Sequence, residues 1–412
     1  MNILKSKKRS LIAMDYLNLL LMNIHLGVRP YLVVYLSTAL SWNPLQIGMI
    51  MSISGLVGVL AQTPVGGLID ISKYKRLLII VGALIIGICS LITVLVNDFI
   101  VICATQSMAS IAGTVFAPAV AAISLGIVGR KNIDKQIGRN QTFTAVGNVL
   151  AAIAIGLCSY FWGTMWIYYT IVLMSLLVVV TVFFIKEKDI DHQLARGADH
   201  ERDEQAVTSN IWELITKRST IIFIVSVILF HSANAAMLPM LGQLLSAEEP
   251  RYASAYLSAC IIVAQLVMIP LGVHIGALAS IMNRRPLMLI AFLILPIRGL
   301  LYTVSGNPFF LISIQVLDGI AASITGVMQI MIAADITRGT GRLNFMQGLT
   351  ATALGFGTAL SNLLSGYLIK YEGFNIGFIS LAFLALAALG FFYFAMPETK
   401  EQEREARLVN KL

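Results

Sequence analysis

The chain has 412 residues, of which 58% are hydrophobic and only 12% are charged, and its mean hydropathy is +0.83. A soluble domain carries about a quarter charged residues, so this composition excludes an ordinary soluble enzyme or binding domain. The net charge of +8 comes from 29 Lys and Arg against 21 Asp and Glu. The basic residues gather in short clusters between apolar blocks. This arrangement indicates membrane topology, and it argues against nucleic-acid binding.

Apolar blocks of 18 or more residues recur along the chain, and each is long enough to cross a bilayer as a helix. The breaks between them are turn-forming residues or charges, such as Asn43-Pro44 and Gly306-Asn307-Pro308. The first block lacks the small-residue cleavage pattern of a signal peptide. We therefore predict an all-α integral membrane protein with about twelve transmembrane helices, at residues 11–37, 44–69, 77–96, 99–129, 141–161, 165–185, 219–245, 252–280, 287–305, 308–334, 343–369 and 375–396.

The longest polar stretch divides these predicted spans six and six. We expect an N-terminal six-helix half at 1–185, a charged cytoplasmic linker at 186–218, a second six-helix half at 219–396 and a cytoplasmic tail at 397–412. An even number of spans places both termini on one side of the membrane. That side takes about 25 of the 29 Lys and Arg, so both termini are predicted to be cytoplasmic.

The two predicted halves share residues at a nearly constant offset. His25 and His231 lie 206 positions apart (231 − 25), and so do Gln141 and Gln347 (347 − 141). The offset extends over four helix pairs, which favours an origin by duplication. A duplicated membrane transporter typically has its binding cavity between the halves, near the middle of the bilayer.

One cytoplasmic loop carries a recognisable motif. The stretch "GGLIDISKYKR", Gly66 to Arg76, resembles the signature G-x-x-x-D-(R/K)-x-G-(R/K)-(R/K) of the major facilitator superfamily. Gly66, Asp70 and the pair Lys75-Arg76 match the motif, whereas Ile71 replaces its basic residue. The resemblance implies a gating role, in which Asp70 accepts hydrogen bonds at the N-terminus of the eleventh helix and Gly66 permits close helix approach. The alternative is a solvated turn that only sets topology.

Other stretches extend this resemblance over essentially the whole chain. "QSMASIAGTVFAP" in the fourth span is similar to the superfamily motif R-x-x-x-G-x-G…P, except that Gln106 stands where proton-coupled relatives have arginine. "MPETK", at residues 396–400, resembles the usual exit from the twelfth helix. "GVRPYLVVYL", "HSANAAMLPMLGQ" and "LPIRGLLYT" resemble a bacterial group of efflux-like permeases, some of them associated with siderophore export. The resemblance implies two pseudo-symmetric six-helix halves.

Polar residues at membrane depth are few, and such residues are candidates for function. We predict that the substrate is bound by eight of them: Asn23, His25, Arg29, Gln106, His231, Asn234, Gln315 and Gln347. His25 and His231 fall near mid-bilayer, where they would bind an anionic substrate or carry protons near neutral pH. The alternative is that each histidine is a packed, hydrogen-bonded core residue.

An isolated arginine stands out in the predicted ninth span. Arg298, in "LILPIRGLLYTV", has no acidic residue within a helical turn. From the helical rise, Arg298 lies roughly 10 Å below the outer end of its span, and Asp318 lies roughly 15 Å down the next one. An unpaired charge at such depth costs roughly 2.5–3.5 kcal/mol, so we predict that the two residues pair. The pair is either structural only, or structural and proton-coupling.

The predicted function is that of a secondary active transporter, a monomer in the bacterial inner membrane. It would export a small organic solute, such as a siderophore, another metabolite or a drug, by antiport with protons. An uptake permease and a transport-inactive membrane sensor are the alternatives. No H-E-x-x-H motif, paired catalytic carboxylates or phosphate loop is present, and the four cysteines have no metal-ligand spacing. We therefore predict no enzyme activity, no metal site, no cofactor and no nucleic-acid partner.

Overall fold

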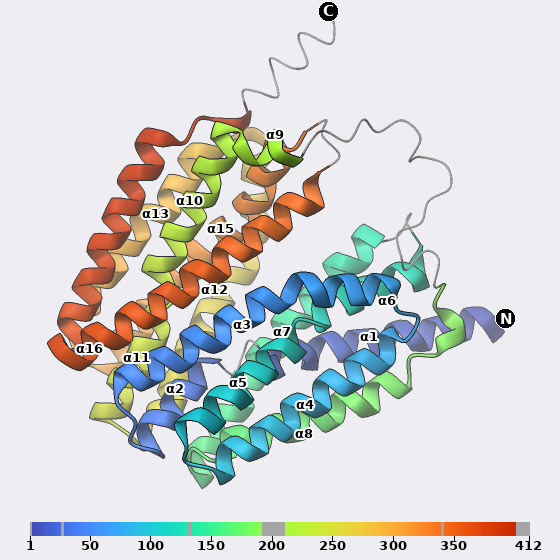
Figure 1. Ribbon diagram of the computed structural model, residues 1–412, viewed down its shortest axis with the longest axis horizontal. Helices are drawn as coiled ribbons and strands as arrows, with labels where there is room; N and C mark the ends of the chain where they lie inside the picture. Colours follow the sequence, from blue (N-terminus) through green and yellow to red (C-terminus); the bar gives the residue numbers. More distant parts are fainter. Residues whose placement is uncertain (1, 26–28, 130–132, 192–210, 339–341, 401–412) are drawn as a thin grey trace, which may run out of the picture. The chain divides into compact units, whose positions relative to one another are not determined.

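The computed structural model describes residues 2–25, 29–129, 133–191, 211–338 and 342–400, and every regular element in them is a helix (Figure 1). The chain forms two compact units. The first comprises Met1–Glu201 with Leu245–Ile262, and the second comprises Arg202–Leu244 with Val263–Leu412. Residues 245–262 thus cluster with the first unit, and the predicted division at 186–218 stays a prediction.

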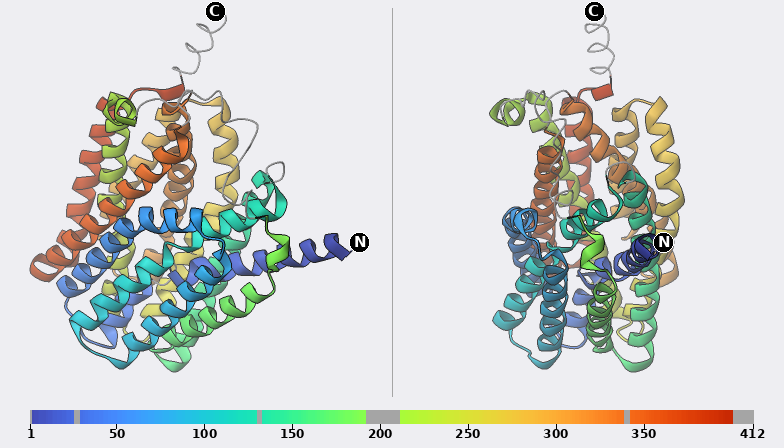
Figure 2. Two further views of the ribbon diagram at one scale, coloured as in Figure 1. Left: turned by 45° about the vertical axis from the view of Figure 1, so that its right-hand side comes forward. Right: turned by 90° about the vertical axis from the view of Figure 1, so that its right-hand side faces the viewer.

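The first unit consists of long helices joined by short turns. Helices α4 and α8 pack along each other, and α1 packs on α7 and α8 (Figure 2). Asn43 begins α3 with a capping box, in which its side chain accepts from the Gln46 N–H at 3.1 Å. The bounds are α1 Asn2–His25, α2 Arg29–Thr38, α3 Pro44–Ile71, α4 Lys75–Leu95, α5 Phe99–Gly113, α6 Phe116–Val128, α7 Ile133–Trp162, α8 Trp166–Phe183 and the 3-10 turn η2 Glu187–Asp189.

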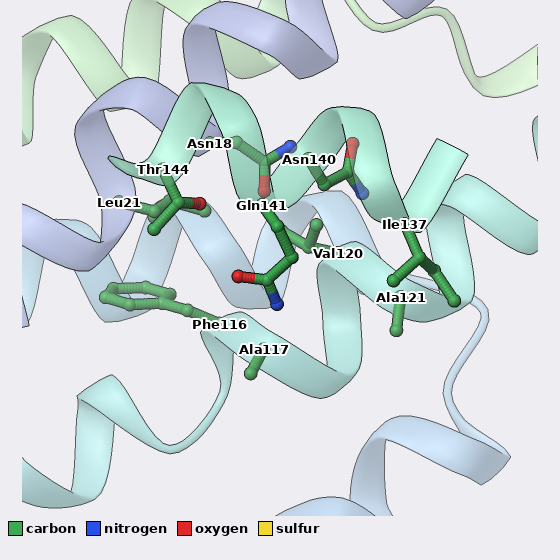
Figure 3. Close-up of a pocket in the computed structure, with 10 residues that line it drawn as sticks. All are labelled: Asn18, Leu21, Phe116, Ala117, Val120, Ala121, Ile137, Asn140, Gln141 and Thr144. Carbon is green, nitrogen blue, oxygen red and sulfur yellow. The ribbon is translucent and has the colours of Figure 1, made fainter. Parts of the chain in front are cut away.

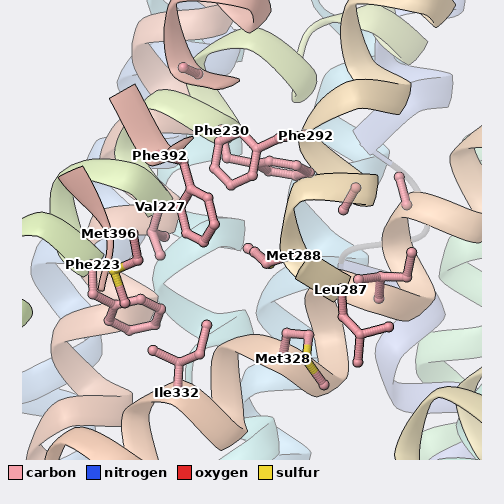
Figure 4. Packing of buried hydrophobic residues seen from close by; sticks show 14 of the residues in the cluster. Phe223, Val227, Phe230, Leu287, Met288, Phe292, Met328, Ile332, Phe392 and Met396 are labelled. Carbon is pink, nitrogen blue, oxygen red and sulfur yellow. The ribbon is translucent and has the colours of Figure 1, made fainter. Parts of the chain in front are cut away.

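The second unit is built around an apolar core between α10, α13, α15 and α16 (Figure 4). Its centre is aromatic: the Phe292 ring lies 5.0 Å from that of Phe230 and 4.7 Å from that of Phe392, between centroids. The remaining bounds are α9 Ile211–Thr216, α10 Arg218–Asn234, α11 Met237–Glu248, α12 Ala253–Ile281, α13 Arg284–Leu301, α14 Pro308–Ser313, α15 Gln315–Ile336 and α16 Leu343–Ala395; α11 and α12 carry residues of both units.

Nine helices in the described part of the chain are long and apolar enough to cross a membrane. One of them, α16, passes through Gly373, whose φ of 86° and ψ of 174° break the helix, so it comprises two of the predicted spans. Helix α13 is apolar over most of its length but carries Arg284, Arg285 and Arg298. The predicted fold class is therefore confirmed as all-α and membrane-spanning, and the helices are consistent with twelve spans.

Candidate functional site

The predicted ion pair between α13 and α15 is present in the second unit. Arg298 Nη1 donates to Asp318 Oδ1. The Arg298 side chain is only 2% exposed, whereas that of Asp318 is 23% exposed. The carboxylate is thus the more accessible partner of a guanidinium that is almost fully buried.

Two further groups hold Arg298, and both flank a break between helices. Nη2 donates to Asn234 Oδ1 at 2.5 Å, and Nε and Nη2 lie 3.3 and 3.1 Å from Met237 Sδ. Asn234 ends α10 and Met237 begins α11, while the Ala236 N–H between them donates to Ser361 Oγ at 3.0 Å. A thioether is a weak acceptor, so Asp318 and Asn234 provide most of the stabilisation of the buried charge. Interrupted helices with polar groups at the break are typical of transporter binding sites.

A glycine follows each member of the ion pair and allows a neighbouring helix to come close. A Cβ on Gly299 would lie 3.0 Å from Ala382 Cβ, and a Cβ on Gly319 would lie 2.5 Å from Ala264 O. Small residues at such positions permit tight helix packing in membranes. The Arg298–Asp318 pair therefore sits on helices that are closely packed against α16 and α12.

The predicted site residue His231 lies on α10 close to α15 and α16. Its Nε2 is 3.3 Å from Gln329 Nε2. Gly357 of α16 packs against this turn of α10, since a Cβ there would lie 2.5 Å from Ile228 O and 3.1 Å from His231 Cβ. His231 has a polar neighbour in Gln329, and the substrate-binding role stays a prediction.

A cavity of about 230 Å³ lies in the first unit between α1, α6 and α7 (Figure 3). The α7 residues Ile137, Asn140, Gln141 and Thr144 line it. Their spacing of three and four residues places them on one helix face. Asn18 and Leu21 of α1 and Phe116, Ala117, Val120 and Ala121 of α6 complete the lining.

The polar groups of this cavity are neutral, namely three carboxamides and one hydroxyl. Two of the amides are buried and fixed: Asn140 Nδ2 donates to Ser124 Oγ at 3.0 Å, and Asn18 Nδ2 donates to Met14 O at 2.7 Å. Gln141 is exposed, and Figure 3 shows its side chain reaching toward α6. The cavity thus offers hydrogen bonds to an uncharged ligand between apolar walls.

The other predicted residues of the first unit lie outside this cavity. Arg29 Nη2 donates to Ser110 Oγ at 3.2 Å, and Gln106 Nε2 donates to Thr93 Oγ1 at 3.1 Å. The side chains of Asn23 and His25 lie outside the described residues. Their predicted roles stay predictions.

In the second unit, two predicted glutamines are separate from the contacts described for Arg298. Gln315 is buried, and its Nε2 donates to Tyr302 Oη at 2.9 Å and to Leu311 O at 3.3 Å. Gln347 is exposed on α16. Both remain predicted ligands, and the structure gives Gln315 a local structural role as well.

The predicted gating residues lie at the junction of α3 and α4. Lys75 Nζ donates to Ser72 O at 2.7 Å, and Arg76 Nη1 donates to Glu187 Oε2 at 3.0 Å. A Cβ on Gly66 would meet open space within the first unit. The Asp70 side chain lies outside the described residues, so the gate stays a prediction.

Sequence reasoning missed four residues of these sites: Asn18, Asn140, Met237 and Ser361. The amides lie toward the ends of predicted spans, where polar residues are ordinary. The spacing of Asn140, Gln141 and Thr144 was the available signal for the cavity. In the described part of the chain, no group of three His, Cys, Asp or Glu side chains is placed to hold a metal ion.

Two relatives match almost the whole chain in sequence. The chain is 38% identical over 396 residues to "Uncharacterized MFS-type transporter Rv2456c" of Mycobacterium tuberculosis (strain ATCC 25618 / H37Rv) and equally to "Uncharacterized MFS-type transporter MT2531" of strain CDC 1551 / Oshkosh. Each match covers 96% of this chain and 95% of the relative.

Solved structures share the fold at low sequence identity. A point mutant of the nucleoside transporter NupG superposes with a TM-score of 0.79 at 14% identity, over 95% of this chain and 100% of that one. A bacterial homolog of the human lysosomal transporter Spinster, inward-facing and unoccupied, gives 0.75 at 14% identity, over 95% and 97%. A point mutant of the peptide transporter POT gives 0.73 at 12% identity, over 94% and 93%.

A family profile also matches most of the sequence, over residues 17–295 and 263–411. The extent of the profile match, the two relatives that are 38% identical over 396 residues, and the helical fold all lead to one assignment. The chain belongs to the Major Facilitator Superfamily and is a multi-pass membrane transporter.

Proposed function

We propose that this transporter is a proton-coupled exporter of a small organic solute, working by alternating access in a bacterial inner membrane. The observation that carries the proposal is the Arg298–Asp318 pair of α13 and α15, whose buried guanidinium also contacts Asn234 and Met237 on either side of the break between α10 and α11. Ionisable groups at membrane depth are costly, and in transporters they commonly form proton relays.

The exposure of the two side chains suggests how a proton would act. Asp318 is 23% exposed and Arg298 is 2% exposed, so the carboxylate is the group that a proton reaches. Protonation removes its negative charge and leaves the buried guanidinium with Asn234 and the Met237 thioether. The protonated state is less stable, and it favours a rearrangement of the break between α10 and α11, which Asn234 and Met237 flank. A ligand that favours the rearranged state is thereby coupled to the proton.

The neutral cavity of the first unit supports a solute with uncharged hydrogen-bonding groups. Its volume of about 230 Å³ is below the roughly 300–1,000 Å³ of sites for drug-sized ligands. It therefore suits one polar portion of a solute, such as an amide or hydroxyl group beside an apolar surface. Siderophores, other metabolites and drugs all contain such portions, and the sequence resemblance to efflux-like permeases favours this range.

Transport by purified protein in liposomes tests the proposal. The candidate solute is chosen as a metabolite that accumulates inside a deletion strain and is depleted from its medium. The wild-type protein is expected to concentrate it under a pH gradient, with proton movement reported by an internal dye. The double variant Asp318→Asn with Arg298→Gln should fold and exchange the solute without concentrating it. A double variant that still concentrates the solute would exclude the coupling role.

The same measurements separate the alternatives. If the protein is an uptake permease, the deletion strain should fail to take the solute from its medium. The solute would then remain in the medium and be depleted inside the cells, which is the opposite of the distribution expected for an exporter. A transport-inactive sensor predicts no movement of any solute under any gradient, even though the protein binds it.

A further inference from the structure

A second cavity, of about 450 Å³, lies in the second unit where α10 begins and α16 ends. Lys217, Arg218 and Arg285 line it, together with Ser219 and Phe394, and none of its lining residues is acidic. The candidate membrane spans Arg218–Glu248 and Phe345–Ala395 begin and end at this level. The cavity is therefore a basic pocket at the membrane surface.

Two donors in this pocket have no acceptor within the described structure, although Arg285 Nη2 donates to Tyr393 O and the guanidinium lies over the Tyr393 ring. Ser219 is only 5% exposed, and its Oγ has no hydrogen-bond partner there. Arg285 Nε is also buried without a partner, and no side chain caps the N-terminus of α10. Buried polar groups are nearly always paired, and a helix N-terminus attracts negative charge. Together these features point to an anionic ligand.

The first unit contains a matching cluster in which the chain supplies the anions itself. The sequence Lys-Arg-Ser occurs at 8–10 and again at 217–219, and Arg76 and Arg285 have the same offset of 209 (285 − 76). In the first unit, Ser10 Oγ donates to Asp189 Oδ2 at 2.6 Å, and Arg76 Nη1 donates to Glu187 Oε2 at 3.0 Å. Both carboxylates come from η2, which follows α8.

In the second unit these two carboxylates have no equivalent at Ser219 and Arg285. The position that matches Glu187 is Met396 (396 − 187), which packs in the apolar core. The position that matches Asp189 is Glu398 (398 − 189), but its two oxygens accept the backbone N–H groups of Arg284 and Arg285 at 2.9 and 3.0 Å. Among the described residues, Nε is unpartnered in both Arg76 and Arg285, and Arg285 Nη2 donates to Tyr393 O. The difference between the clusters is that neither Ser219 nor the Arg285 guanidinium has a carboxylate partner in the described structure, whereas Ser10 and Arg76 do.

We propose that this pocket binds the phosphate group of an anionic phospholipid. The phosphate would accept from Ser219 Oγ and Arg285 Nε and would lie beside the positive end of α10. Apolar side chains around the pocket favour a lipid over free phosphate: Phe394 lines it and is 85% exposed, and Ile221 and Tyr393 are 50% and 52% exposed nearby in the sequence. Basic pockets between transmembrane helices on the cytoplasmic side are typical sites for anionic headgroups.

Native mass spectrometry of the delipidated full-length protein tests the proposal. The probes are phosphatidylglycerol, phosphatidylcholine and inorganic phosphate. Wild-type protein is expected to bind phosphatidylglycerol in preference to phosphatidylcholine, with little competition from phosphate. Arg218→Gln and Arg285→Gln should each weaken phosphatidylglycerol binding about fivefold. Arg76→Gln, which changes the matching arginine of the first unit, should leave that affinity within about twofold of wild type.

A pair of serine variants separates ligand binding from stability. In lipid-free detergent, Ser10→Ala should lower the Tm because it removes the hydrogen bond to Asp189. Ser219→Ala should leave that Tm unchanged or raise it, since the hydroxyl has no partner there, and should reduce the Tm gain on adding phosphatidylglycerol. Equal binding of the two lipids would overturn the proposal, and so would unchanged phosphatidylglycerol affinity in both arginine variants. Displacement by millimolar phosphate would identify a free-phosphate site instead.

Discussion

Arg298 illustrates how far individual residues are predictable from the sequence. The pairing with Asp318 followed from depth alone, because α13 and α15 are joined by a short connection and one carboxylate lay at a matching depth. The contacts with Asn234 and Met237 did not follow. They depend on the break between α10 and α11, which hydropathy does not reveal because both sides of the break are equally apolar. The cavity of the first unit was missed for a similar reason, since Asn18 and Asn140 resemble ordinary polar residues near helix ends.

The burial of the pair leads to an asymmetric prediction for its single variants. Asp318→Asn leaves a guanidinium of 2% exposure without its carboxylate, whereas Arg298→Gln leaves a carboxylate of 23% exposure. Removing one partner of a buried pair costs about 3–5 kcal/mol. We therefore expect Asp318→Asn to lower the Tm in detergent more than Arg298→Gln does, and the double variant to recover most of the loss.

The first unit provides the control for this experiment. Glu187→Gln removes one partner of the Arg76–Glu187 pair, in which Glu187 is 49% exposed. Exposed pairs contribute about 0–1 kcal/mol, so this variant should change the Tm little. Equal losses from the Asp318, Arg298 and Glu187 variants would contradict the importance of burial.

At the scale of helices, the sequence predicts where spans exist better than how they are interrupted. Helix α3 begins at Pro44 and α14 begins at Pro308. Both starts agree with the breaks predicted at Asn43-Pro44 and Gly306-Asn307-Pro308, because proline is favoured in the first turn of a helix. Interruptions after Gly113, Asn234 and Ser313 fall inside predicted spans. They depend on local turns within apolar sequence, which leave no change of composition to detect. Close approaches between helices are equally local, and they are set by single glycines.

Two glycines of α16 give a direct test of such an approach. A Cβ on Gly357 would lie 2.5 Å from Ile228 O, whereas a Cβ on Gly348 would meet nothing within 4 Å. Gly357→Ala is expected to destabilise the protein by about 1–3 kcal/mol through overpacking against α10. Gly348→Ala should stabilise it by up to about 1 kcal/mol through helix propensity.

Thermal unfolding of both purified variants in the same detergent measures the difference. If Gly357→Ala unfolds at or above the wild-type temperature, α10 and α16 pack less tightly than the structure indicates. Substrate binding by the same variant adds a second readout, since His231 lies beside this contact.

At the scale of the whole molecule, the family and the helical class follow from sequence, and the orientation in the membrane is still a prediction. About 25 of the 29 Lys and Arg lie on the side of the termini, which the positive-inside rule assigns to the cytoplasm. The predicted division of the chain at 186–218 also stays a prediction; by contacts, residues 245–262 cluster with the first unit although they follow α10 in sequence. That association depends on contacts such as the 2.7 Å hydrogen bond between Tyr31 Oη and Ser258 Oγ.

Single-cysteine labelling of intact cells tests the orientation. Lys370→Cys and Lys73→Cys replace exposed lysines at predicted outer and cytoplasmic positions, in a chain whose four native cysteines are replaced. A membrane-impermeant maleimide should label the cysteine at position 370 and not the one at position 73. Loops rich in Lys and Arg, such as the one that contains position 73, stay on the cytoplasmic side of the membrane. Permeabilised cells should show labelling at both positions. Labelling of intact cells only at position 73 would show that the topology is the opposite of the predicted one.

The hydrogen bonds from Arg284 and Arg285 to Glu398 have a consequence for how the protein is made. Helix α13 begins at Arg284, but the carboxylate that accepts its first N–H groups lies more than a hundred residues later in the chain, beyond α16. During synthesis, α13 enters the membrane before its own cap exists. Domains generally complete folding only once their sequence is available, so the first N–H groups of α13 gain their carboxylate acceptor only after α16 has been synthesised. Until then this end of α13 is without the carboxylate that caps it in the finished protein.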